Sequence, residues 1–288
     1  MKRLLNAAIA VIATALSALS LTAQAQERFT DTISGQGPDL ILIPGLASSG
    51  DVWTATAKQL SSTRRVHVLQ VRGFAGEPAG PNAEGEVIKP LAAEIAAYAA
   101  KLDHPAIIGH SIGGLIAMEV AAAKPDAISR ILIVDALPFY SLLYGPTATA
   151  QTAKPFAEQA RTQILAMTDA QFAEAQTQTM GMMSLTESVR PTLVDWSVRS
   201  DRRVMAQAMY DAMTDDARPL LSAIKAPVSV LYAWDDTMGQ PQEMADGIYA
   251  NAYKGLPAAK LIRIDGSFHF IMLDQPEAFA KAVTAFLN

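Results

Sequence analysis

Short apolar runs alternate with longer helical patterns along most of the chain. The apolar runs, rich in Val, Ile and Leu, are typical of buried strands and lie at 40–43, 66–71, 106–108, 131–134, 228–232 and 260–264, after a short first strand expected at 29–33. Helical patterns follow several of these runs, at 52–60, 85–102, 115–123 and 276–287. This alternation is typical of βαβ units and predicts an α/β fold with a mostly parallel central sheet flanked by helices.

The alternation stops between the strands expected at 131–134 and 228–232. Residues 137–222 have a helical pattern with no clear strand and contain seven of the twelve methionines. We expect them to form a helical cap inserted into a core made of residues 26–136 and 223–288. Because methionine is flexible and polarizable, such a cap can adapt to varied apolar ligands, although a single methionine more often only fills the seam between packed parts.

The first 25 residues have the pattern of an export signal. Lys2 and Arg3 precede an apolar run from Leu4 to Leu21, and small residues follow at Ala23 and Ala25. This pattern is typical of a secretory signal peptide cleaved after Ala25, and an uncleaved membrane anchor is the alternative. We therefore expect a periplasmic or secreted protein that has no stable membrane insertion after cleavage.

The amino-acid composition limits the classes of molecule that we expect the protein to bind. Half of the 288 residues are apolar, which is enough for one large α/β core with an insertion. The formal net charge of −5 becomes two units more negative without Lys2 and Arg3, which argues against nucleic acid and anionic membranes as partners. Cysteine is absent and the four histidines form no ligand cluster, so we expect no disulfide, no metal and no other cofactor.

The candidate chemistry begins at residues 109–113, which read Gly-His-Ser-Ile-Gly between an expected strand and an expected helix. In this context the pattern is typical of a nucleophile elbow, a strained turn that exposes the central serine hydroxyl above the edge of the sheet. Glycines are needed two positions before and after the serine, because a side chain there would collide with the neighbouring strand or helix. Ser111 is therefore the candidate nucleophile.

A serine hydroxyl needs a base to take its proton. His67 lies inside an expected strand and His104 lies in a turn, while His110 is next to Ser111 on a tight turn where successive side chains point apart. His269 follows the last expected strand, at the carboxyl edge where a parallel sheet carries its chemistry. We expect His269 to be the general base.

The base in turn needs a carboxylate that orients it. Asp235 and Asp236 follow the strand expected at 228–232, so either can serve. The chain order is then serine, aspartate, histidine, which is the order of the α/β hydrolases and differs from that of the two serine-protease types.

With these motifs the chain resembles the α/β-hydrolase superfamily, of the capped, small-molecule serine esterase type, over essentially the whole mature sequence. Further matching segments are Pro44-Gly45-Leu46, Arg72-Gly73 and the stretch 266–276 around His269. The resemblance implies an α/β-hydrolase fold and places the acid on Asp236, three positions after a small residue, with Asp235 as the alternative.

The resemblance also implies a pocket for the oxyanion of the tetrahedral intermediate. The backbone N–H of Ile112, directly after the nucleophile, would be the first donor, and that of Leu46 would be the second. Family members often have His-Gly before the second donor, where this chain has Pro44-Gly45. The backbone donor is kept, but a side chain that often organises the loop is missing.

The function implied is hydrolysis of a carboxylic ester or lactone of a small, apolar or aromatic substrate through an acyl-enzyme. A serine nucleophile disfavours the dehalogenase and epoxide-hydrolase branches of the superfamily. Candidate substrate contacts are Trp53, Phe139, Tyr140, Trp196, Met238 and Phe268. The alternatives are an acyltransferase or perhydrolase with the same triad, a ligand-binding or sensing protein on this fold, and a hydrolase of amides or peptides.

Overall fold

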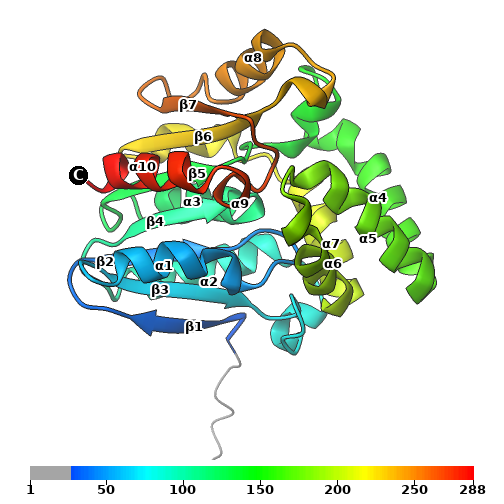
Figure 1. Ribbon diagram of the computed structural model, residues 1–288, viewed down its shortest axis with the longest axis horizontal. Helices are drawn as coiled ribbons and strands as arrows, with labels where there is room; N and C mark the ends of the chain where they lie inside the picture. The colour runs from blue at the N-terminus through cyan, green and yellow to red at the C-terminus, as the bar shows by residue number, and fades with distance from the viewer. Residues whose placement is uncertain (1–26) are drawn as a thin grey trace, which may run out of the picture.

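A seven-stranded sheet forms the centre of the computed structural model, which describes residues 27–288 (Figure 1). The signal peptide expected at residues 1–25 lies outside the described residues. In the order β1-β3-β2-β4-β5-β6-β7, the strands are Phe29–Ser34 (β1), Arg65–Val71 (β3), Asp39–Ile43 (β2), Ala106–His110 (β4), Arg130–Val134 (β5), Val228–Trp234 (β6) and Lys260–Asp265 (β7). Only β1 pairs antiparallel, so the expected α/β fold with a mostly parallel sheet is confirmed.

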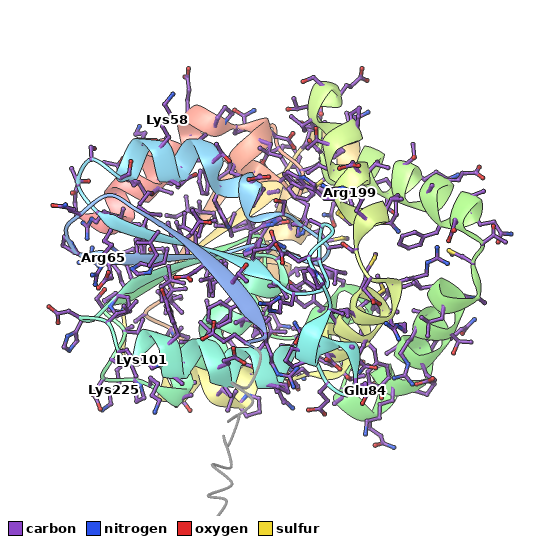
Figure 2. The ribbon with its side chains drawn as sticks, turned by 90° about the horizontal axis from the view of Figure 1, so that it is seen from below. Lys58, Arg65, Glu84, Lys101, Arg199 and Lys225 are labelled. Carbon is purple, nitrogen blue, oxygen red and sulfur yellow. The ribbon has the colours of Figure 1, made fainter. Side chains whose placement is uncertain are left out.

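Helices cover both faces of this sheet. One face packs against α1 (Thr54–Leu60), α9 (Ile271–Asp274) and α10 (Pro276–Leu287), and the other packs against α2 (Ile88–Ala99), α3 (Ile112–Ala123) and α8 (Gln242–Ala252). Strand β2 shows why its sequence is continuously apolar, since Leu40 and Leu42 enter one layer of the core while Ile41 and Ile43 enter the other. The charged side chains of Lys58, Lys101 and Lys225 lie on the outside (Figure 2).

Four further helices occupy the chain between β5 and β6 and are called here the inserted helices. They are α4 (Ala150–Ala166), α5 (Asp169–Met183), α6 (Arg190–Arg199) and α7 (Arg202–Thr214), and Figure 1 shows them grouped beside one end of the sheet. Thr149, Thr168 and Asp201 start α4, α5 and α7, because each side chain accepts a hydrogen bond from a backbone N–H of the first turn. Among the helices of residues 27–288, none combines the length and the apolar character that a membrane span requires.

A pair of buried carboxyl groups joins the core to the inserted helices. Glu119 on α3 lies against Asp215, which directly follows α7, and Nζ of Lys89 lies 3.2 Å from Oδ1 of Asp215. Burial, and then the neighbouring Asp215 carboxylate, raise the pKa of Glu119 to about 9. Glu119 is therefore protonated at neutral pH, and Lys89 balances the charge of Asp215.

This arrangement predicts how stability depends on pH. Unfolded Glu119 ionises near pH 4.5, whereas the folded protein keeps the proton up to about 9, so its contribution to stability is complete below 4.5 and declines as pH rises through this window. Glu119→Gln stays neutral at every pH. Relative to the native chain, it should gain ~4 kcal/mol of unfolding free energy between pH 5 and pH 8, at about 1.4 kcal/mol for each pH unit. Urea unfolding at both values measures this gain, and an equal difference at the two pH values would contradict it.

Candidate active site

Ser111 occupies the turn between β4 and α3 in a strained conformation. Its φ is 54° and its ψ is −128°, a combination uncommon for a residue with a side chain. The flanking residues have to be glycines because a side chain there would collide with neighbouring backbone, as the sequence predicted. A Cβ on Gly109 would lie 2.1 Å from the carbonyl oxygen of Gly113, and one on Gly113 would lie 2.5 Å from that of Ile43. The turn therefore holds the serine at the end of β4.

His269 lies in the loop between β7 and α9, and Asp274 shapes this loop. Oδ2 of Asp274 accepts a hydrogen bond from the backbone N–H of Phe268 at 2.9 Å. The same carboxylate accepts hydrogen bonds from the hydroxyl of Ser184 at 2.7 Å and the N–H of Thr186 at 2.9 Å, both in the chain between β5 and β6. The His269 loop is thus tied to the segment that carries the inserted helices.

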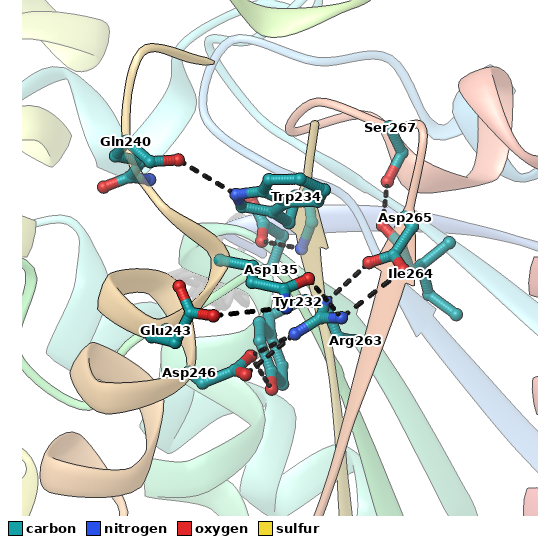
Figure 3. Close-up of polar contacts among 12 residues, drawn as sticks. Asp135, Tyr232, Trp234, Gln240, Glu243, Asp246, Arg263, Ile264, Asp265 and Ser267 are labelled. Carbon is teal, nitrogen blue, oxygen red and sulfur yellow. Dashed lines mark hydrogen bonds and ion pairs between the residues drawn. The ribbon is translucent and has the colours of Figure 1, made fainter. Parts of the chain in front are cut away.

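The strand that leads into this loop is held by a polar network, shown in Figure 3. The guanidinium of Arg263 on β7 lies between the carboxylates of Asp246 and Asp265, with Nη1 2.7 Å from Oδ2 of Asp246. The hydroxyl of Tyr232 on β6 donates to Oδ1 of Asp246 at 2.8 Å. Because Asp246 lies on α8, the network joins α8, β6 and β7 beside the site.

Asp135 is the carboxylate that contacts His269. Its Oδ2 lies 2.7 Å from Nδ1 of His269, while its Oδ1 accepts hydrogen bonds from the N–H of Ala233 and the hydroxyl of Tyr249, both at 2.9 Å. Burial acts to raise the pKa of Asp135, but the contacts with His269, Ala233 and Tyr249 outweigh it, so the pKa is lowered overall. Asp135 therefore stays ionised although it is enclosed by protein.

The expectation that Asp236 contacts His269 is wrong. Strand β6 continues to Trp234, two residues beyond its expected end, so both aspartates fall past the sheet into a short turn. Asp236 is exposed there, and Asp235, the alternative, accepts a hydrogen bond from the N–H of Thr237 at 2.9 Å. In the described part of the chain neither carboxylate bonds to His269.

A sequence signal for Asp135 existed. It directly follows the buried strand expected at 131–134, which is the same feature that favoured Asp235 and Asp236. Choosing among the three requires knowing where each strand ends and which strands are neighbours. The order serine, aspartate, histidine is unchanged when Asp135 replaces Asp236.

His110 supports the His269 loop from beneath. The two rings have centroids 4.5 Å apart, and Nε2 of His110 lies 3.0 Å from the carbonyl oxygen of His269. Burial, and then the nearby His269, lower the pKa of His110 to about 3, so its ring is neutral and Nε2–H donates to that carbonyl. A Cβ on Gly45 would lie 2.9 Å from Nδ1 of His110, so the ring packs directly against this glycine. The sequence argues against His110 as a base, but no pattern in it indicates this supporting contact.

The two expected oxyanion donors are free to bind a ligand. Ile112 is the first residue of α3, so its N–H has no partner within the helix. Leu46 lies in the loop after β2 and lines a cavity at the site. Within residues 27–288, no carbonyl oxygen accepts a hydrogen bond from either N–H.

The cavity beside Ser111 and His269 has a volume of about 160 Å³. Four of the seven methionines of residues 137–222 line it, namely Met180, Met183, Met205 and Met209. Met167, Met182 and Met213 do not, and Met182 is exposed. The apolar character expected for the site therefore comes mainly from α5 and α7.

None of the six residues expected to contact substrate lines this cavity. Trp53 stacks on Phe279 at 6.1 Å inside the core, and Phe139 is fully buried under the guanidinium of Arg218. Trp196 and Met238 pack against the core, and Phe268 lies on the loop before His269, where Phe270 lines the cavity instead. The large aromatic side chains pack in the core instead, which their size favours.

Tyr140 is a separate case among these six. Its hydroxyl is completely buried and has no hydrogen-bond partner among residues 27–288. The Ser111 side chain is close enough to act on the pKa of this hydroxyl, which burial raises strongly. Tyr140 therefore lies near the serine without lining the cavity.

Comparisons with known proteins agree with this geometry. The model of the alpha/beta hydrolase family matches residues 40–282. The chain is 26% identical over 265 residues to a pimeloyl-[acyl-carrier protein] methyl ester esterase of Chromobacterium violaceum, an alignment that covers 90% of this chain and 98% of the relative.

Solved structures give the same fold. An enol-lactonase from Burkholderia xenovorans LB400 superposes with a TM-score of 0.71 at 19% identity, covering 90% of this chain and 96% of that chain. A thermophilic esterase from Thermogutta terrifontis gives a TM-score of 0.70 at 19% identity, covering 90% and 92%. At these identities the likeness shows the fold alone.

The neutral state of His110 can be tested directly. Because burial lowers its pKa from 6.5 to about 3, the His110 ring should not gain a proton between pH 8 and pH 5. In the unfolded chain it would protonate near pH 6.5, so its contribution to stability should be complete above that value and decline as pH falls towards 3. NMR titration of the imidazole nitrogens, assigned with His110→Gln, measures this, and a His110 signal that titrates near pH 6.5 would contradict it.

Proposed function

Because this chain belongs to the alpha/beta hydrolase family and is a hydrolase, we propose that it cleaves a carboxylic ester or lactone of a small, predominantly apolar substrate. Ser111 is the nucleophile, His269 is the general base and Asp135 is the acid of the triad. The observation that carries this proposal is the 2.7 Å contact between Nδ1 of His269 and Asp135, next to a serine held in a strained elbow.

The first half of the proposed reaction forms an acyl-enzyme. The Ser111 oxygen attacks the carbonyl carbon while Nε2 of His269 takes the hydroxyl proton, and Asp135 stabilises the resulting imidazolium. The oxyanion accepts hydrogen bonds from the N–H groups of Leu46 and Ile112. When the intermediate collapses, the bond to the alcohol oxygen breaks and His269 returns the proton to that oxygen.

Water completes the cycle. His269 takes a proton from water, the hydroxide oxygen bonds to the acyl carbon, and collapse of the second intermediate releases the acid as the proton returns to Ser111. In a lactone the alcohol and acid stay on one product molecule. Product analysis with added alcohol, thiol or peroxide separates this hydrolysis from acyl transfer to another acceptor.

The size and lining of the cavity support a small substrate. Its volume of about 160 Å³ is below the roughly 300–1,000 Å³ of pockets for drug-sized ligands. The four methionines favour apolar groups. Two of the similar proteins are named for the cleavage of an ester and a lactone, which agrees with this substrate class.

Matched variants test the triad. With short-chain p-nitrophenyl esters, Ser111→Ala and His269→Ala should lose nearly all activity. Asp135→Asn should lower kcat by about 10³–10⁴-fold, because the neutral amide no longer holds the required imidazole tautomer. Asp236→Asn is the control and should stay within about twofold of the native enzyme, since an exposed carboxylate in a surface turn has little effect.

Thermal unfolding of each variant separates loss of chemistry from loss of fold. Undiminished ester hydrolysis by Ser111→Ala or His269→Ala would contradict the proposed mechanism. A larger loss of activity in Asp236→Asn than in Asp135→Asn would identify Asp236, which follows β6, as the acid of the triad. If the native protein cleaves no ester or lactone but binds one tightly, a ligand-binding role replaces catalysis.

Export is a further part of the proposal, supported by the basic start, apolar run and Ala-x-Ala end of residues 1–25. When the full chain is made in a bacterial host, mass spectrometry of the periplasmic fraction should find a protein that begins at Gln26. Ala25→Arg should block this processing, because the cleavage site requires a small residue. An unprocessed native chain confined to the cytoplasm would contradict export.

A further inference from the structure

Gln176 breaks the apolar pattern of the helix that covers the cavity. The buried positions of α5 are Phe172, Gln176 and Met180, which are spaced four residues apart and so lie on one face of the helix. The first and last are apolar, as an inward face requires, whereas the middle position carries an amide. Gln176 is only 7% exposed, and that exposure is towards the cavity, which it lines.

Two other polar side chains of the cavity lining, Thr179 and Ser48, form hydrogen bonds to nearby backbone carbonyls. The hydroxyl of Thr179 donates to the carbonyl of Ala175 at 2.8 Å, and that of Ser48 donates to the carbonyl of Leu46 at 3.3 Å. The Gln176 amide has no such partner anywhere in residues 27–288. The fully enclosed unpaired side-chain atoms of residues 27–288 do not include those of Gln176, so its amide is open to the cavity. A mostly buried amide that faces a cavity without a protein partner points to a ligand.

The charge of the lining defines the ligand group. No Lys, Arg, Asp or Glu lines the cavity, and the adjacent His110 is neutral. A carboxylate or ammonium of a substrate would enter without a counter-charge, which is costly away from water. The Gln176 amide both donates and accepts hydrogen bonds, so it suits a neutral oxygen such as that of an ether, hydroxyl or carbonyl.

We propose that Gln176 determines specificity by forming a hydrogen bond to a neutral oxygen on the part of the substrate that fills this cavity. The preferred substrates are then short esters or lactones with a second, uncharged oxygen function, rather than all-carbon esters of the same length. This inference rests on the proposed ester hydrolysis and adds a substrate class to it.

Isosteric substrate pairs test the inference. In the acyl series, p-nitrophenyl methoxyacetate is compared with p-nitrophenyl butanoate, and in the alcohol series, 2-methoxyethyl acetate is compared with butyl acetate. Each pair replaces one methylene by oxygen. The measured quantity is the ratio of kcat/KM for the oxygen-containing ester to that for the all-carbon ester, and comparing this ratio between variants cancels intrinsic reactivity.

Gln176→Leu should lower this ratio by about tenfold in at least one series, since a lost hydrogen bond to an enclosed group discriminates on this scale. Gln178→Leu is the matched control, because Gln178 is exposed on the same helix and the same substitution there should leave both ratios unchanged. Gln176→Met, which matches the surrounding methionines, serves as a second variant if Gln176→Leu does not fold.

The outcomes separate the two proposals. An active native enzyme whose ratios are the same in Gln176→Leu, or change equally in Gln178→Leu, overturns the role of Gln176 and leaves ester hydrolysis standing. A native protein inactive on all four esters and on lactones overturns the proposed function, and this inference with it.

Discussion

The short contact between Asp135 and His269 is the interaction on which the site depends. The two residues are far apart in the chain, and the sheet brings them together because β6 lies between the strands that carry them, β5 and β7. The N–H of Ala233 on β6 holds the other oxygen of Asp135, so the central strand also orients the carboxylate. A shift in the register of any of these strands would separate the Asp135 carboxylate from the His269 imidazole, which links the geometry of the site to the hydrogen bonds of the sheet.

Two titratable groups near this contact differ in charge, since the Asp135 carboxylate is ionised and the His110 imidazole is neutral. Asp135 remains ionised because three groups bind its oxygens, whereas the fully buried His110 remains neutral because burial outweighs the Asp135 carboxylate and the His269 carbonyl, which both favour its charged form. An imidazolium formed at His269 would therefore lie beside the ionised Asp135 carboxylate, and the His110 ring would add no second positive charge. The inserted helices add apolar methionines to the cavity lining, and an apolar lining lowers the local dielectric constant, which strengthens these electrostatic interactions.

Sequence patterns predicted the structure best where the physical cause of a feature lies in neighbouring residues. Every expected strand is present and extends only one or two residues beyond its expected limits, because continuous apolar runs are what strands buried on both faces require. The elbow at Ser111 was equally accessible, since its glycines are required by contacts within a few residues or with the adjacent strand. The aromatic candidates failed because the presence of a large apolar side chain does not reveal whether it faces the core or a cavity.

By itself, the sequence determined the α/β architecture, the strained serine turn and a histidine after the last strand. Only the tertiary structure decided which aspartate meets that histidine, that His110 supports its loop, and that Gln176 enters an otherwise apolar face. These features depend on the lateral order of the strands, on the point at which β6 ends and on how α5 packs over the site. The physical reason is that hydrogen bonds and burial between distant segments arise from their positions in space, and no local pattern of residues encodes those positions.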